Sequence, residues 1–94
     1  MNDFECLKII VSGKVQGVFF RQSTHKLAND LKLMGYVKNL ATGDVEILVY
    51  GSTDNITRLL SFVNIGPPSA YVFRLRLSVA DGKSFDYTDF RIES

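Results

Sequence analysis

The residues best suited to chemistry lie in one short segment, residues 12–21, with the sequence SGKVQGVFFR. Glycines at positions 13 and 17 remove side chains where a backbone curls tightly or approaches a ligand. A curled run of N–H groups that leads into a helix N-terminus attracts anions, because both present partial positive charge. Arg21 adds a guanidinium fork that matches phosphate oxygens. The segment therefore predicts a site for a small anion, although a glycine turn followed by a surface arginine fits the same residues.

Asn39 is the second candidate, because it ends a short apolar run and precedes the turn residues 40–44. Its carboxamide both donates and accepts hydrogen bonds, so it can hold a water molecule in one orientation. Asparagine before a glycine turn is also common for conformational reasons alone, and Gly43 follows here. Residue type by itself favours the turn role.

Other catalytic arrangements lack the residues they need. The chain has one cysteine, Cys6, and one histidine, His25, so neither an internal disulfide nor a multi-histidine metal site is expected. No glycine-lysine-serine/threonine run follows the glycines at 13 and 17, and the third glycine of a dinucleotide-binding fingerprint is missing. His25 lies one helical turn beyond Arg21, but an ordinary exposed helix position is favoured for it. Any chemistry must come from positioning and electrostatics, without a metal or cofactor.

The periodicity of apolar residues predicts the elements that position these groups. Alternation predicts strands, and apolar residues at helical spacing predict two amphipathic helices. In chain order, the pattern predicts a strand over about residues 5–12, a helix from Phe20 to Met34 capped by Gly35, an extended run over 36–38, a strand over 45–50, a helix that begins at Ser52 or Thr53 and stops before 66–68, a strand over 71–79 and a last strand over 85–92.

The strand over residues 71–79 has the clearest alternation in the chain. Its apolar positions are expected to form a buried face, with the polar positions between them exposed to solvent. The expected buried face consists of Tyr71, Phe73, Leu75, Leu77 and Val79.

This order of elements predicts an α+β fold: a two-layer α/β sandwich of ferredoxin-like βαββαβ topology with an additional C-terminal strand. Two helices then cover one face of a mainly antiparallel sheet. The first two strands are joined through a helix and run parallel, so residues 12–21 and Asn39 share one edge of the sheet. With one strand between them, they lie roughly 10 Å apart, a gap that suits a small anion.

Length and composition restrict the classes of protein that fit. The 94 residues, 46% hydrophobic and 22% charged, suit one globular domain over residues 1–94. A net charge of +1 argues against a dedicated nucleic-acid binder, and no apolar stretch is long enough to span a membrane. The acidic first residues do not suit a signal peptide. We therefore expect a cytoplasmic protein with no nucleic-acid or membrane partner.

Two segments together resemble the signatures of the acylphosphatase family. The first is residues 11–21, VSGKVQGVFFR, which matches that signature at every position it fixes. The second is residues 35–39, GYVKN, followed at the family's spacing by Gly43, Val45 and Gly51. Weaker similarity continues to the end of the chain, so the resemblance covers essentially all of it.

The resemblance implies a metal-independent hydrolase that converts acyl phosphates to carboxylate and inorganic phosphate, with no cofactor. It assigns phosphate binding to Arg21 and orientation of the attacking water to Asn39. Inorganic phosphate would be both product and competitive inhibitor, and the enzyme would act as a monomer. The backbone N–H groups that the resemblance assigns to the phosphate cradle belong to Gln16, Gly17, Val18, Phe19 and Phe20.

Two other functions remain open. Leu40 stands where many members of the family carry a serine or threonine hydroxyl near the water, and this departure suits a regulatory module that binds an anion without turnover. Single-stranded RNA-binding domains share the strand order, but they need interleaved basic and aromatic residues on the open sheet face. Arg74 and Arg76 supply charge there without a matching aromatic motif.

Overall fold

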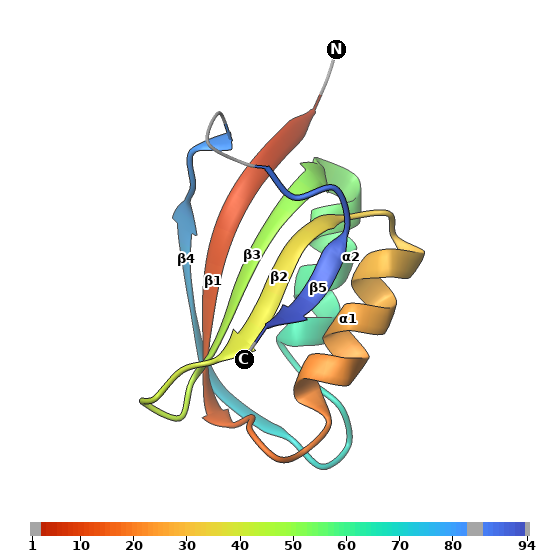
Figure 1. Ribbon diagram of the computed structural model, residues 1–94. Coiled ribbons are helices and arrows are strands. Elements are labelled where there is room, and N and C mark those ends of the chain that lie inside the picture. The colour runs from red at the N-terminus through yellow and green to blue at the C-terminus, as the bar shows by residue number, and fades with distance from the viewer. Residues whose placement is uncertain (1–2, 83–85, 94) are drawn as a thin grey trace.

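The computed structural model describes residues 3–82 and 86–93. Figure 1 shows a single sheet with two helices on one of its faces, which confirms the predicted architecture. The elements are β1 (Phe4–Lys14), α1 (Phe20–Asp30), β2 (Met34–Asn39), β3 (Val45–Ser52), α2 (Thr53–Val63), β4 (Tyr71–Val79) and β5 (Phe90–Glu93).

The strand order places the two candidate segments at one edge of the sheet. The order is β4-β1-β3-β2-β5, with β2 and β5 parallel and the other neighbours antiparallel. Strand β3 therefore lies between β1 and β2, as predicted. The loop after β1, the start of α1 and the end of β2 all meet at the lower end of the sheet in Figure 1.

The hydrophobic core fills the space between the sheet and the helices. Ile9, Val11 and Ile47 of the central strands have no exposed surface, and Ile56 and Leu59 of α2 belong to the same buried cluster. Burying a side chain of this size contributes about 1.5–3 kcal/mol each. Close packing of this kind fixes the ends of β1, β2 and β3 relative to one another.

The first helix is shorter than the sequence pattern predicts. It ends at Asp30 in a Schellman motif, in which Leu33 N–H donates to Ala28 O at 2.9 Å and Lys32 N–H donates to Asn29 O at 3.0 Å. Lys32, with φ of 57°, takes the left-handed position that the prediction gave to Gly35. The predicted helix end was therefore wrong, because the chain uses a lysine where glycine is the usual residue.

Gly35 does not end the helix but belongs to β2, where it is needed for close contact with the neighbouring strand. It pairs with Val49 of β3 and has φ of 136°. A Cβ at this position would overlap the carbonyl oxygen of Leu48. Glycine is needed here because the neighbouring strand occupies the space of a side chain.

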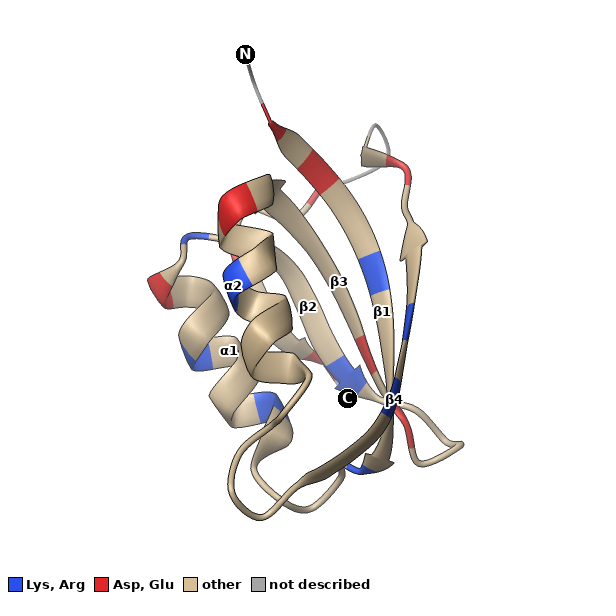
Figure 2. Cartoon of the chain, turned by 180° about the vertical axis from the view of Figure 1, so that it is seen from behind, with Lys and Arg blue, Asp and Glu red and all other residues tan. Residues whose placement is uncertain are grey.

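The predicted buried face of β4 is largely exposed. Phe73 is 66% exposed, Leu77 is 50% exposed and Val79 is 88% exposed. Strand β4 is at one edge of the sheet, and in Figure 2 it lies to one side of both helices. The strand was predicted correctly but its buried face was not. Val72, expected on the exposed face, packs against the core together with Leu75, because the pairing with β1 shifts register between Ser12 and Gly13. No helix lies over most of the other apolar residues of β4 (Figure 2).

The last strand is also shorter than predicted. Strand β5 begins at Phe90, and residues 86–89 before it are not part of a strand. Phe85, the predicted first residue, lies outside the described residues. The chain already contacts β2 one residue before β5 begins: Gly35 N–H of β2 donates to Asp89 O at 2.9 Å. Across the described residues, no helix has the length and apolar character needed to cross a membrane.

Candidate active site

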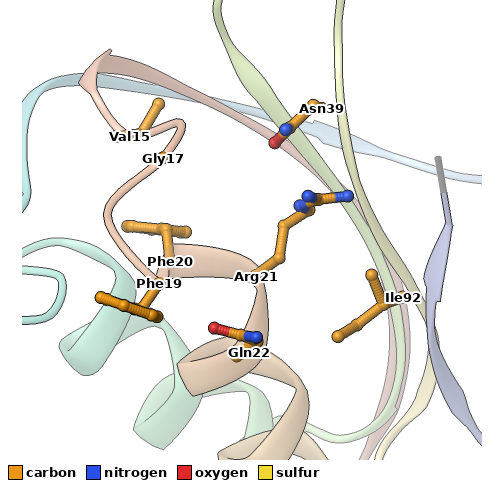
Figure 3. Close-up of a pocket in the computed structure, with 8 residues that line it drawn as sticks. All are labelled: Val15, Gly17, Phe19, Phe20, Arg21, Gln22, Asn39 and Ile92. Carbon is orange, nitrogen blue, oxygen red and sulfur yellow. The ribbon is translucent and has the colours of Figure 1, made fainter.

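A cavity of about 290 Å³ opens at the sheet edge where the two predicted segments meet (Figure 3). It contains Arg21 and Asn39 together with three of the five predicted cradle residues. The other two, Gln16 and Val18, are not among the residues that line it. The residues around it are Val15, Gly17, Phe19, Phe20, Arg21, Gln22, Asn39 and Ile92.

The loop that forms one wall of this cavity has two residues in the left-handed conformation. Gly17 has φ of 74° and Phe19 has φ of 66°. A Cβ at Gly17 would meet no atom within 4 Å, so the backbone conformation rather than space favours glycine there. Phe19 has a bulky side chain, and holding such a residue in the left-handed conformation costs about 1–3 kcal/mol. Successive changes of backbone hand turn neighbouring N–H groups into one concavity.

The backbone donors of this loop are not used elsewhere. Within residues 3–82 and 86–93, the N–H groups of residues 16–20 make no hydrogen bond. Phe19 is the N-cap of α1, and its side chain cannot cap the helix; the first bond of the turn is from Ser23 N–H to Phe19 O at 3.1 Å. Orphan donors at a helix start are ordinarily satisfied by a polar cap. Here they remain available to an anion.

Arg21 lies in the first turn of α1 and is half-buried. In Figure 3 its guanidinium extends across the cavity toward the carboxamide of Asn39. The ion pairs found among the described residues join other groups, and none includes Arg21. An unpaired guanidinium beside unpaired N–H donors gives the cavity a positive local potential.

Asn39 is the last residue of β2 and pairs through its backbone with Val45 of β3. Its side-chain Oδ1 is buried and has no hydrogen-bond partner among the residues that the structure describes. An acceptor in this state costs free energy, and native structures contain few of them. The carboxamide oxygen is therefore able to accept a further hydrogen bond.

Comparison with known proteins identifies the family. The family model described as Acylphosphatase matches residues 7–92. The chain belongs to the acylphosphatase family. A curated acylphosphatase from Coxiella burnetii is 46% identical over 87 residues, which are 93% of this chain and 90% of that protein.

Solved acylphosphatase structures have the same fold. An acylphosphatase from Coxiella burnetii aligns with a TM-score of 0.88 at 44% identity, covering 97% of this chain and 94% of that one. The acylphosphatase from Bacillus subtilis aligns with a TM-score of 0.87 at 33% identity, covering 95% of this chain and 98% of that one. The predicted family is confirmed, and with it an acylphosphatase enzyme whose substrate is a small acyl phosphate.

One contact in this acylphosphatase was not found from the sequence. The Nε2 of Gln16 donates to Leu40 O at 2.9 Å and to Asp44 O at 2.8 Å. Both acceptors are backbone carbonyls in the turn between β2 and β3. The available signal was a two-donor carboxamide in a loop whose neighbours are apolar or glycine.

His25 and Tyr36 are not among the described residues that line the acylphosphatase cavity. Nε2 of His25 is 3.1 Å from Asn29 Nδ2, and its ring packs 6.5 Å from that of Phe90. Tyr36 donates a hydrogen bond of 2.6 Å to Glu46, and burial together with this bond raises the pKa of the tyrosine. In the described part of the chain, no three histidine, cysteine or acidic side chains are grouped so as to hold a metal ion.

Proposed function

We propose that this enzyme hydrolyses the carboxyl–phosphate bond of acyl phosphates without a metal, holding the phosphoryl group between residues 16–20 and Arg21. The observation that carries the proposal is the set of N–H donors over residues 16–20 that have no partner among the described residues. Phosphoryl transfer spreads negative charge over three equatorial oxygens, and donors fixed in advance stabilise that charge. Arg21 adds a bidentate, permanently charged fork to the same concavity.

Asn39 would orient the attacking water. Its buried Oδ1 accepts a hydrogen bond from the water, which directs a lone pair of the water oxygen at phosphorus. The new oxygen–phosphorus bond forms as the bond to the acyl oxygen breaks, and the electron pair of that bond leaves with the carboxylate. The proton of the water passes to the phosphate product or to solvent.

The choice of an acyl phosphate over an alkyl phosphate follows from the leaving group. Carboxylic acids have pKa values of about 4, so a carboxylate leaves as a stable anion at neutral pH and needs no general acid. Among the described residues, those that line the cavity include no histidine and no carboxylate. An alkoxide would require a proton donor that these side chains do not supply.

The same cradle would bind inorganic phosphate, and we expect competitive inhibition by this product. The lining residues come from elements of one chain, so we propose that residues 1–94 act as one unit and that a monomer is sufficient for turnover.

The test is hydrolysis of benzoyl phosphate by the purified protein in the presence of EDTA. Metal-independent turnover is expected, and Arg21→Gln should lower it about 10²- to 10³-fold, as loss of one strong transition-state donor commonly does. Arg58→Gln is the matched control, because Arg58 is an exposed arginine on α2 that does not line the cavity. A folded wild-type protein that binds phosphate without hydrolysing it would contradict the proposal and favour a regulatory module.

A further inference from the structure

The two parts of the proposed site are carried by segments that the sheet does not join directly. Strand β1 pairs with β3 only as far as Val11, opposite Val45. Beyond this pair, residues 12–14 of β1 pair with β4 on the other side. The cradle loop, residues 15–19, therefore leaves the sheet beside β4, while Asn39 lies across β3.

The side chain of Gln16 spans this separation. Its two amide hydrogens are shared between Leu40 O at 2.9 Å and Asp44 O at 2.8 Å. Within the described ranges, these are the hydrogen bonds found between residues 15–19 and residues 39–45. The two acceptors face each other across the hairpin, since Leu40 N–H also donates to Asp44 O at 2.8 Å.

We infer that Gln16 is a positioning residue, whose carboxamide holds Asn39 at its working distance from the phosphate cradle. The inference rests on the proposed roles of the cradle and of Asn39. The backbone N–H of Gln16 belongs to the cradle, whereas its side chain binds the residue directly after Asn39. One residue thus fixes both parts of the site, and displacement of a reacting group by about 1 Å can cost roughly 10²-fold in rate.

The hairpin does not need Gln16 in order to form. Its own ladder continues to Asn39 opposite Val45, and the bond from Leu40 to Asp44 closes the turn. Loss of the Gln16 side chain therefore removes the placement of the hairpin relative to the loop, rather than the hairpin itself. The cradle N–H groups are backbone groups and stay in place. The effect should fall on kcat, with little change in phosphate binding.

The first measurement is Gln16→Met, which keeps the length of the side chain and removes both donors. We expect kcat for benzoyl phosphate to fall about 10- to 100-fold, while the inhibition constant of phosphate stays close to that of the wild type. Asn55→Leu is the matched control. It removes a bond of the same kind, from Asn55 Nδ2 to Leu31 O at 3.0 Å, away from the site. It should lower the free energy of unfolding and leave kcat unchanged.

A double-mutant cycle with Asn39→Ala separates positioning from general support. If Gln16 acts through Asn39, Gln16→Met should have little further effect on kcat once Asn39 is alanine. An equal loss in both backgrounds, with Asn39→Ala itself nearly inactive, would overturn this inference and leave the proposed function intact. Wild-type turnover by Asn39→Ala would refute the role of Asn39 and the inference with it. If Gln16→Met does not fold, Gln16→Asn is used instead, because its amide is too short to reach both carbonyls. An unchanged kcat in that variant would overturn the inference.

Discussion

Replacing Asn39 by alanine should lower activity while raising stability, because the same side chain carries a cost in the folded chain. Its Oδ1 is buried without a hydrogen-bond partner among the described residues. A buried acceptor in this state costs about 1–3 kcal/mol. Alanine removes the acceptor, and the backbone pairing with Val45 is unaffected. Some packing is lost at this half-buried position, so we expect a net gain of about 1 kcal/mol in the free energy of unfolding.

The effect on catalysis should be larger and of opposite sign. Without the carboxamide, the attacking water loses its fixed orientation, and removal of a group that acts in the transition state commonly costs about 10²- to 10³-fold in kcat. The cradle donors and Arg21 are untouched, so the inhibition constant of phosphate should stay near the wild-type value. Activity would fall even though the protein becomes harder to unfold.

Two assays check this pair of effects. Thermal unfolding followed by circular dichroism, in buffer free of phosphate, should show Tm higher by about 4–8 °C, the shift that 1 kcal/mol gives in a domain of this size. Benzoyl phosphate hydrolysis supplies kcat, and Asn64→Ala, at an exposed asparagine after α2, is the control for the loss of an amide. Unchanged kcat would refute the water-orienting role. A lower Tm would show that the carboxamide supports the fold, which would refute the argument from its unpaired oxygen.

Two further predictions concern the sheet. In the folded chain, burial and the hydrogen bond to Glu46 raise the pKa of Tyr36, so the folded chain keeps the phenol proton at a pH where the unfolded chain, with a pKa of about 10, releases it. The contribution of Tyr36 to the free energy of unfolding is therefore complete below about pH 10 and declines above it. Urea unfolding should show that Tyr36→Phe loses about 1 kcal/mol at neutral pH and that its deficit shrinks as the pH rises above 10; a constant deficit would contradict this. In the same assay, Gly35→Ala should lose about 3 kcal/mol or more because its Cβ overlaps Leu48 O, whereas Gly43→Ala, with φ of 95° and open space, should lose only about 1–2 kcal/mol. Equal losses would contradict the steric account.

The number of strands and their order along the chain could be predicted from the sequence, because alternation is a local property of an extended chain. What covers a face is not local. The apolar residues of β4 were expected to share one buried face, yet Phe73 and Val79 are exposed, since β4 lies at one edge and the helices lie over other strands. Which strand becomes the edge depends on pairing between distant segments, and alternation does not encode it.

The end of α1 could not be predicted for a different reason. Residue preferences at a helix end are weak, and the pattern assigned the left-handed position to Gly35 because glycine adopts it most easily. Lys32 occupies it instead, and the two bonds of the Schellman motif hold it there. The glycine is required by contact with β3, which is again a relation between segments far apart in the chain.

In the candidate site, too, local features could be predicted from the sequence and contacts between distant segments could not. Residues 16–20 and Arg21 could be found from the sequence because they are consecutive and their proposed chemistry belongs to a local backbone conformation. Asn39 could be placed near them because the crossover through α1 makes β1 and β2 parallel. The link through Gln16 could not be found, since its partners are the backbone carbonyls of Leu40 and Asp44, which every residue type possesses. A side chain that positions a site through backbone acceptors leaves a trace in the sequence at one end of the contact only, and only a structure identifies the other end.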